Sequence, residues 1–298
     1  SFPTRRSSDL TITGEVNARY FFDAPAGELP LTWRLSKQRE YFSLPGYHVG
    51  PESYAWTSAF YFGDRFSFYG ETVDSGEART NSQGLLTMPL AIPPEEQPQR
   101  YTLEATITDE SGYPVSGRQT WTVHPADFYI GVRPDTWLGQ AGEEIVFEVL
   151  TVDWNRDASP DRDLVARFRE VTWRREETSD PYMPPELTPD YTPVANTDFR
   201  TGADGLARLA FTPPEPGIYQ LDVRGDDGAV TQITLWIGGP GQASWPNLPN
   251  QRLRLSADQE SYTPGDTAEI FIPNPFGDGA QALITVERSI VSRHFVLA

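Results

Sequence analysis

Short strands separated by turn residues dominate this sequence, and they constrain its fold more than any other feature. Apolar and polar residues alternate in runs such as YTLEATITD (101–109), EIVFEVLTVD (144–153) and VTQITLWI (230–237). Alternation with a period of two is typical of strands that bury one face. The 27 prolines and 24 glycines interrupt longer runs, and no window keeps a helical period. We therefore predict an all-β protein built from tandem antiparallel β-sandwiches.

An internal repeat divides the chain into units of about 120 residues. Residues 80–112 align with residues 201–228, and residues 255–272 align with residues 132–149. The matched pairs include Gly84 with Gly205, Leu85 with Leu206, Tyr101 with Tyr219, Gly265 with Gly142, and Tyr262 with Trp137. Because an immunoglobulin-type sandwich has about 100 residues, each unit is predicted to be one sandwich.

Both ends of the sequence depart from this organisation. Residues 1–10, SFPTRRSSDL, are interpreted as a translated sequencing adapter, and no signal peptide is predicted because no apolar segment follows Arg5 and Arg6. At the other end, QALITVERSIVSRHFVLA stops within apolar, β-branched sequence, so we expect a fragment of a longer chain. The predicted organisation is a non-native scar at 1–10, sandwiches at 11–125 and 126–238, a linker at 239–249, and the truncated start of a third sandwich at 250–298.

The composition excludes several classes of partner and site. A formal net charge of −18 and a pI near 4.5 argue against nucleic acid and anionic membrane as partners. The sequence has no cysteine, which excludes disulfides, thiolate metal sites and cysteine nucleophiles within it. No apolar run approaches the roughly 20 residues that span a bilayer as a helix.

No pattern in the sequence predicts a catalytic, cofactor-binding or metal site. The three histidines, His48, His124 and His294, are far apart, and the motifs HExxH, GxSxG, GxxxxGK and GxGxxG are missing. We interpret these histidines as ordinary strand or loop residues, and the sequence leaves open a triad assembled in space. The chain is therefore expected not to be an enzyme, and no site residue and no cofactor is assigned.

Two acidic clusters raise the alternative of a calcium site, because oxygen-rich loops suit that ion. The clusters comprise Asp153, Asp157, Asp161 and Asp163, and then Asp222, Asp226 and Asp227. They lack the spacing of an EF-hand loop, and Arg156 and Arg162 lie within the first cluster. Solvated loop carboxylates are the favoured interpretation.

The aromatic segment at 41–71 raises a second alternative, a platform on which sugar rings stack. Alternation over residues 60–69 instead favours strands whose aromatic side chains fill the first core. The inward residues are predicted to be Trp56, Phe60, Phe62, Phe66 and Phe68. Tyr101 and Tyr219 each begin a strand and are interpreted as the corner tyrosines of sandwiches.

Two proline-containing segments are interpreted as connections. DPYMPPELTPDYTP (180–193) is predicted to be a surface loop with polyproline character. In SYTPGDTAEI (261–270), Pro264 presets φ and Gly265 tolerates a positive φ, which predicts a type II turn between two strands.

The C-terminal residues carry a resemblance to a known family. LRLSADQESYTPGDTAEIFIPNPFGDGAQALITVERSIV (253–291) resembles the opening of the bait-region domain of bacterial alpha-2-macroglobulins. That pattern consists of a strand, Tyr-x-Pro-Gly-Asp, an apolar strand, Pro-Phe, a Gly-Ala step and a Leu-Ile-Thr-Val-Glu-Arg strand. The segments EVNARYFFDAPA (15–26), YTLEATITDESGYPVSG (101–117) and HPADFYIGVRPDTWLGQAG (124–142) are similar to the macroglobulin-like domains that precede it.

The resemblance implies a scaffold fragment of a broad-spectrum endopeptidase inhibitor of the periplasm or cell envelope, often anchored to the inner membrane as a lipoprotein. In this family, proteases cleave an exposed bait region, and cleavage triggers a rearrangement that encloses the protease. In many members a downstream Cys-x-Glu-Gln thioester then bonds to the captured enzyme. This chain has no cysteine and is expected to stop before the bait, so no functional residue is carried over. Its expected partners are neighbouring macroglobulin-like domains, and proteases only through other parts of the parent protein.

Two other classes of protein share these sequence features. A cell-surface adhesin or carbohydrate-binding protein of tandem immunoglobulin-like sandwiches would have the same strands and acidity, and fold alone does not separate the two. An enzyme with accessory sandwiches would have its catalytic domain elsewhere. Further repeats downstream favour an adhesin, a Cys-x-Glu-Gln motif favours a macroglobulin, and a neighbouring catalytic module favours an enzyme.

Overall fold

The computed structural model describes residues 10–52, 70–108, 112–176, 186–239, 255–259, 261–274, 281–288 and 290–297. The regular elements in these residues are β-strands, arranged in antiparallel sheets to which one short parallel pair is added. The all-β prediction is therefore confirmed. None of the described segments forms an apolar helix of the length needed to cross a bilayer.

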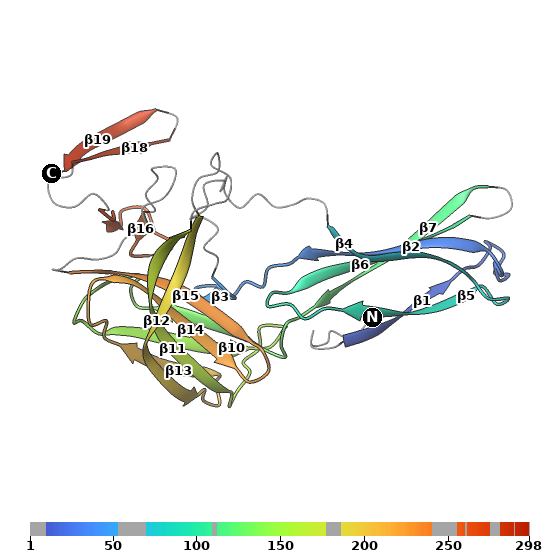
Figure 1. The fold of residues 1–298 in the computed structure, drawn as a ribbon, viewed down its shortest axis with the longest axis horizontal. Coiled ribbons are helices and arrows are strands. Elements are labelled where there is room, and N and C mark those ends of the chain that lie inside the picture. The colour runs from blue at the N-terminus through green and yellow to red at the C-terminus, as the bar shows by residue number, and fades with distance from the viewer. Residues whose placement is uncertain are drawn as a thin grey trace.

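The first sandwich packs a two-stranded sheet against a four-stranded sheet (Figure 1). The small sheet has the order β1 (Leu10–Asn17), β5 (Leu85–Ile92), and the large sheet has the order β4 (Glu71–Arg79), β2 (Pro30–Arg39), β6 (Gln99–Thr108), β7 (Pro114–Val123). Apolar side chains at alternate strand positions meet between the sheets, and Leu35, Leu90 and Tyr101 are at most 1% exposed.

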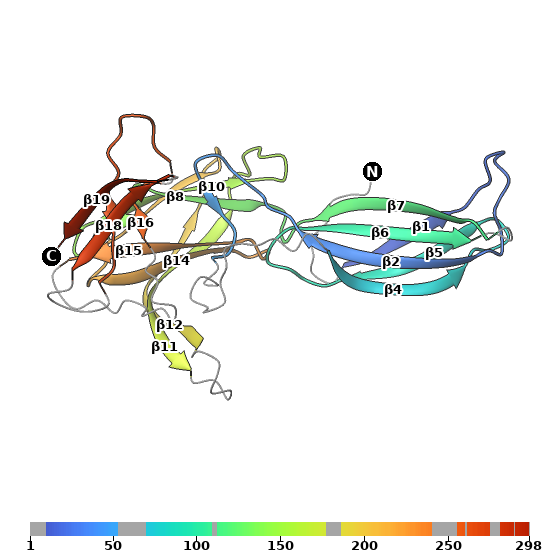
Figure 2. The same ribbon diagram turned by 90° about the horizontal axis from the view of Figure 1, so that it is seen from above.

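The second sandwich repeats this arrangement with more strands at its edges. One sheet has the order β13 (Leu206–Phe211), β10 (Ile145–Val152), β8 (Tyr129–Pro134), β3 (His48–Val49), and the other has the order β12 (Glu186–Arg200), β11 (Asp163–Glu176), β14 (Gly217–Gly225), β15 (Val230–Gly238), β9 (Leu138–Gln140). In the core between them, the ring of Phe168 contacts the rings of Phe147 and Phe211. The two sandwiches lie end to end along the molecule (Figure 2).

Strand β3 pairs in the second sandwich although it falls within the range 11–125 predicted for the first. His48 lies opposite Val132 and Val49 lies opposite Gly131, both in β8. A period-two pattern identifies a strand but not the sheet in which it pairs, so the sequence could not place this strand.

The repeat found in the sequence makes the same hydrogen bonds between two distant chain segments in both sandwiches. Thr80 N donates to Leu29 O at 3.1 Å, and Thr201 N donates to Arg162 O at 3.0 Å. Both threonines are 2% exposed, and the hydroxyl oxygen of each accepts a backbone N–H, from Leu29 and Arg162 respectively. A buried hydroxyl thus satisfies a backbone donor at the same place in each copy.

The C-terminal residues begin a third copy of the same pattern. β16 (Ser256–Ala257) pairs with β17 (Ile270–Phe271). Ala257 lies opposite Ile270 as Pro134 lies opposite Phe147, and each later residue follows its earlier equivalent by 123 positions (257 minus 134, and 270 minus 147). This difference places Tyr262 at the position of Gly139, so its alignment with Trp137 was wrong.

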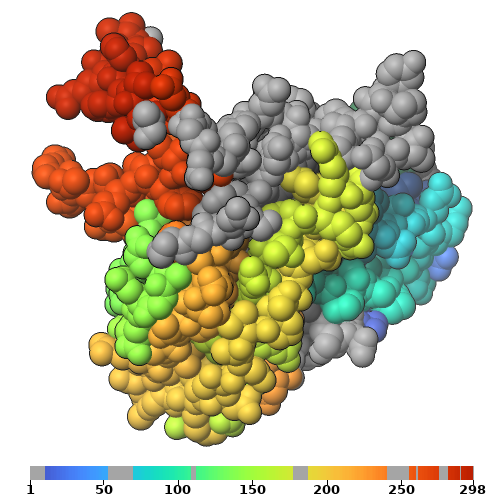
Figure 3. Space-filling model, turned by 60° about the vertical axis from the view of Figure 1, so that its left-hand side comes forward, coloured from blue at the N-terminus to red at the C-terminus, as the bar shows by residue number. Residues whose placement is uncertain are grey.

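The turn predicted at 261–270 is confirmed. Asp266 N donates to Thr263 O at 3.1 Å, and Gly265 has a φ of +107°. Beyond it, β18 (Ala282–Glu287) and β19 (Val291–Leu297) form a hairpin. Each residue of β19 is exposed, and the hairpin stands apart from the second sandwich (Figure 3).

The proline-dense segment differs from its prediction. Residues 186–193 are not a loop but part of β12, which pairs with β11 in a long hairpin that projects from the sandwich (Figure 2). Proline is tolerated there because β12 is an edge strand, and the register shifts by a bulge where Pro193 lies opposite Arg169. Residues 180–185 lie outside the described residues.

The predicted aromatic core residues of the first sandwich also lie outside the described residues. They are Trp56, Phe60, Phe62, Phe66 and Phe68.

Candidate functional site

Residues 40–50, here called the strap, connect the two sandwiches. The strap leaves the first sandwich at the end of β2 and forms edge strand β3 of the second (Figure 1). At its far end, Gly50 N donates to Thr231 Oγ1 at 3.0 Å, and Gln232 N donates to Gly50 O at 3.0 Å. A Cβ on Gly131 of β8 would lie 2.8 Å from Leu44 Cδ2, so the strap lies directly on that strand.

A carboxylate fixes the start of the strap to the first sandwich. Glu40 accepts hydrogen bonds from the Arg100 guanidinium and, at 2.7 Å, from Thr122 Oγ1, and its backbone N donates to Pro98 O at 2.9 Å. Burial favours the neutral acid, but the hydrogen bonds from Arg100 and Thr122 outweigh it and lower the pKa of the Glu40 carboxyl. Glu40 is therefore a charged anchor at neutral pH.

Stacked rings from both sandwiches meet beside this anchor. Phe42 of the strap stacks on Tyr129 with ring centroids 3.8 Å apart, and the Tyr129 hydroxyl is hydrogen-bonded to His124 Nδ1 at 2.7 Å. The His124 ring in turn stacks on Trp154 at 4.8 Å. Burial lowers the pKa of His124, against the opposing charge of Glu40, so its ring is neutral at pH 7.

A second polar contact holds the middle of the strap. The Tyr47 hydroxyl donates to Glu148 of β10, which also accepts from Arg133 Nη2 at 2.5 Å. The Arg133 guanidinium lies 4.8 Å from the centre of the Tyr47 ring, a cation–π contact. Burial and the hydrogen bond to Glu148 raise the pKa of Tyr47 to about 12, against the charge of Arg133.

The contacts at the junction are hydrogen bonds, ion pairs and ring stacks. The structure places His48 in β3, His124 at the junction and His294 in the exposed strand β19, so it does not bring the three histidines together. The described residues hold no group of three possible metal ligands. The junction joins the two sandwiches by a continuous strap, by stacked rings and by charged hydrogen bonds.

The first acidic cluster has structural partners in the protein. Asp153 Oδ1 accepts the backbone N–H groups of Asn155 and Asp157 at 2.8 and 3.0 Å, and Asp163 Oδ2 accepts from Arg200 Nη1 at 2.6 Å. Arg200 Nε also lies 3.7 Å from Asp161 Oδ1. These carboxylates fold turns and pair with arginine instead of converging on one point.

Asp222 contradicts the prediction of solvated loop carboxylates. It lies within β14 and is only 1% exposed. Arg169 and Arg224 each donate to its carboxylate at 2.8 Å, and Gln232 Nε2 donates at 3.2 Å. The signal in the sequence is the alternation of GIYQLDVRG, which places Asp222 within a strand and on the face opposite Leu221 and Val223.

The two tyrosines interpreted as sandwich corners differ in their contacts. Tyr219 is buried, and its hydroxyl donates to Glu215 O, four residues upstream, at 3.0 Å. This is the contact expected of a tyrosine corner, which confirms the interpretation for Tyr219. Tyr101 is also buried, but its hydroxyl has no hydrogen-bond partner among the described residues.

Sequence relatives match most of this chain. It is 22% identical over 281 residues to the alpha-2-macroglobulin homolog of Nostoc sp., which covers 89% of this chain and 14% of the relative. It is 24% identical over 318 residues to the alpha-2-macroglobulin of Escherichia coli, which covers 94% of this chain and 18% of the relative. No family model matches the sequence.

A solved structure agrees on the fold. The native conformation of E. coli alpha-2-macroglobulin matches with a TM-score of 0.51 and 18% identity, over 100% of this chain and 20% of that chain. A trypsin-activated form of the E. coli protein matches with a TM-score of 0.48 and 19% identity, over 99% of this chain and 21% of that one. The tandem sandwiches and the sequence relatives point to one conclusion: along most of its length this chain is similar to bacterial alpha-2-macroglobulins.

Proposed function

We propose that this chain is part of the framework of a protease-trapping alpha-2-macroglobulin and is not itself an enzyme. The observation that carries the proposal is the sequence match along most of the chain to two bacterial alpha-2-macroglobulins. The chain spans 14% and 18% of the length of these relatives, so the bait and the capture machinery of the proposed trap belong to other parts of the parent protein.

The junction supports a framework role. A trap that rearranges after cleavage of its bait needs modules that move as rigid bodies. Only rigid modules pass the motion that starts at the cleaved bait on to distant parts of the protein. The strap, the ring stack at Phe42 and the Glu40 anchor give the two sandwiches this property. The proposed location, from the family, is the periplasm or the cell envelope.

A trapping assay on the full-length parent protein tests the proposal. Trypsin incubated with the parent should lose activity on a large protein substrate and keep activity on a small chromogenic peptide, because a trap excludes large substrates only. The 298-residue chain alone should leave both activities unchanged. Equal loss on both substrates would indicate a blocked active site, and no loss on either would refute trapping.

The framework role has its own test within that assay. A parent carrying Gly131→Val should trap less trypsin, because the new side chain collides with Leu44 of the strap. Gly238→Val is the matched control, since Gly238 has no positive φ and the nearest atoms to a Cβ there, on the side chain of Gln140, lie 3.5 Å or more away. Equal trapping by both variants would contradict a framework role of the junction.

A further inference from the structure

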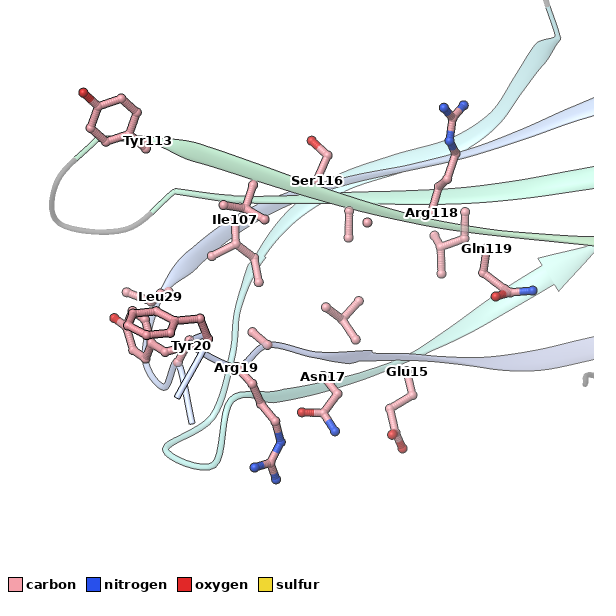
Figure 4. A pocket seen from close by; sticks show the side chains of 18 residues that line it. Glu15, Asn17, Arg19, Tyr20, Leu29, Ile107, Tyr113, Ser116, Arg118 and Gln119 are labelled. Atoms are coloured by element: carbon pink, nitrogen blue, oxygen red, sulfur yellow. The ribbon is translucent and has the colours of Figure 1, made fainter. Parts of the chain in front are cut away.

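The first sandwich has an open groove between β1 and β7. Its volume is about 660 Å³. The buried side chains of Leu103 and Ala105 line it. Tyr20 and Tyr113 lie at one end of it (Figure 4). Along one side runs the edge of β1, which among the described strands pairs only with β5.

In the second sandwich, a strand occupies the position equivalent to this groove. The sequence repeat matches Leu85 with Leu206. Asn17 lies opposite Leu85, and Leu150 lies opposite Leu206, so Asn17 is equivalent to Leu150. The preceding residues, Val16 and Val149, are therefore equivalent as well. In the second sandwich the other edge of β10 is paired with β8 along six positions. Side chains of β8 enter the core, where Ile130 is 1% exposed and Val132 is 0% exposed. Strand β8 therefore occupies the site that corresponds to the groove.

Burial differs between the two sandwiches at the positions that this strand covers. Val149 is fully buried, whereas its equivalent Val16 is partly exposed. Ala229, which directly precedes the facing strand β15, is 4% exposed. Its equivalent in β7 is Val115, as the pairing of β6 with β7 shows, and Val115 is 69% exposed. The first sandwich thus leaves exposed an apolar surface that the second one covers with a strand.

The equivalent contacts define the chemistry of an occupant. It is an extended segment, antiparallel to β1, with apolar residues at alternate positions that enter the core. Glu15 of β1 corresponds to Glu148 of β10, which pairs with Arg133 of β8 at 2.5 Å. A basic residue opposite Glu15 would reproduce this ion pair in the first sandwich.

We propose that the polypeptide directly upstream of residue 11 in the parent protein occupies this groove as an added β-strand. The order of strands supports this occupant, because in both other copies the equivalent strand precedes its partner closely in the chain: β8 precedes β10 with only the three-residue β9 between them, and β16 precedes β17. The proposal rests on the proposed function only in that this chain is part of a larger protein.

A grafted chain tests the proposal without the parent protein. Residues 127–144, which contain β8 and its connection to β10, replace residues 1–11 and are joined directly to Ile12, the equivalent of Ile145. Amide hydrogen exchange in β1 should slow by about tenfold or more relative to the original chain, because a new ladder protects its open edge. The control graft carries Ile130→Asp and Val132→Asp in the grafted copy and should not slow exchange.

A charge exchange tests the register of the added strand. In the grafted chain, Glu15→Lys should reverse most of the protection, and Arg133→Glu in the grafted copy should restore it. A variant that merely unfolds would lose protection in β6 as well and would not be rescued by the second change. Unchanged exchange in β1 of the graft would overturn the proposal.

Analytical ultracentrifugation of the original chain tests the alternative occupant, a second copy of the chain. A dimer in which β1 is already protected would identify a second copy of the chain in the groove and would also overturn the proposal. None of these outcomes depends on protease trapping, so this inference and the proposed function fail separately.

Discussion

Gly84 and Gly205 hold the same conformation in the two sandwiches, with φ of +74° and +77°. The carbonyl oxygen of Gly84 accepts from Ala18 N at 2.8 Å, and that of Gly205 accepts from Thr151 N at 2.9 Å. A Cβ would lie 2.3 Å from Ala18 O and 2.7 Å from Thr151 O. Glycine is therefore required in both copies, by the backbone angle and by the close approach of a second chain segment.

Replacing Gly205 with alanine is expected to lower the free energy of unfolding of the second sandwich by about 2–4 kcal/mol. The positive φ strains alanine, and the new Cβ collides with Thr151 O. Gly142→Ala is the control, because its φ is +84° but no atom lies within 4 Å of a Cβ, and its expected cost is about 1 kcal/mol. Urea unfolding followed by tryptophan fluorescence measures both, and equal losses would contradict the importance of the contact.

Phenylalanine in place of Tyr219 is expected to cost about 1 kcal/mol, because the Glu215 carbonyl loses its hydrogen bond. The same change at Tyr101 should cost less than about 0.5 kcal/mol, since that hydroxyl is buried without a partner among the described residues. Thermal or urea unfolding of the two variants compares them directly. A larger loss at Tyr101 than at Tyr219 would show that the assignment of the corner is reversed.

Acidification is expected to weaken the junction through His124. Burial lowers the pKa of this ring below 6.5 in the folded protein, so the unfolded chain binds the proton more tightly. The contribution of His124 to stability is complete above pH 6.5 and declines as the pH falls toward the lowered pKa, with a slope of at most about 1.4 kcal/mol per pH unit.

Unfolding free energies at pH 7.5 and pH 5.5 check this expectation. His124→Phe should remove most of the pH dependence in this window while keeping a ring beside Trp154. His294→Gln is the matched control, because His294 is exposed in β19. A pH dependence that persists in His124→Phe and vanishes in His294→Gln would disprove the assignment.

Gly131→Val is expected to release the strap from β8. The new side chain would meet Leu44 Cδ2 and the Tyr47 Cβ, which lie 2.8 and 3.0 Å from a Cβ at this position. Amide exchange at His48 and Val49 should rise by about tenfold, and limited proteolysis should cut within residues 40–50. In Gly238→Val, where a Cβ has no atom closer than 3.5 Å, amide exchange and proteolysis should stay as in the original chain. Equal protection in the two variants would argue against docking of the strap by close packing.

Local patterns in the sequence predicted the strands, the repeat and the third copy. Alternation in β6, β10 and β14 is visible because one face of each strand enters a core. The turn at Gly265 was predicted because Pro-Gly restricts φ at two successive positions.

Pairing between distant segments was not predicted. The docking of β3 on β8 joins residues more than 80 positions apart, and the burial of Asp222 depends on arginines from β11 and β14. Prolines in β12 concealed an edge strand, because proline is read as a loop residue unless the sheet edge is known.

The strap makes the second sandwich depend on residues from the first. Because a stretch encoded within the first module completes a sheet of the second, a recombination event that exchanged either module alone would separate β3 from its partner β8. The two sandwiches together are therefore the smallest unit that can be moved between proteins with its sheets intact. They should be cloned, circularly permuted or redesigned as one piece.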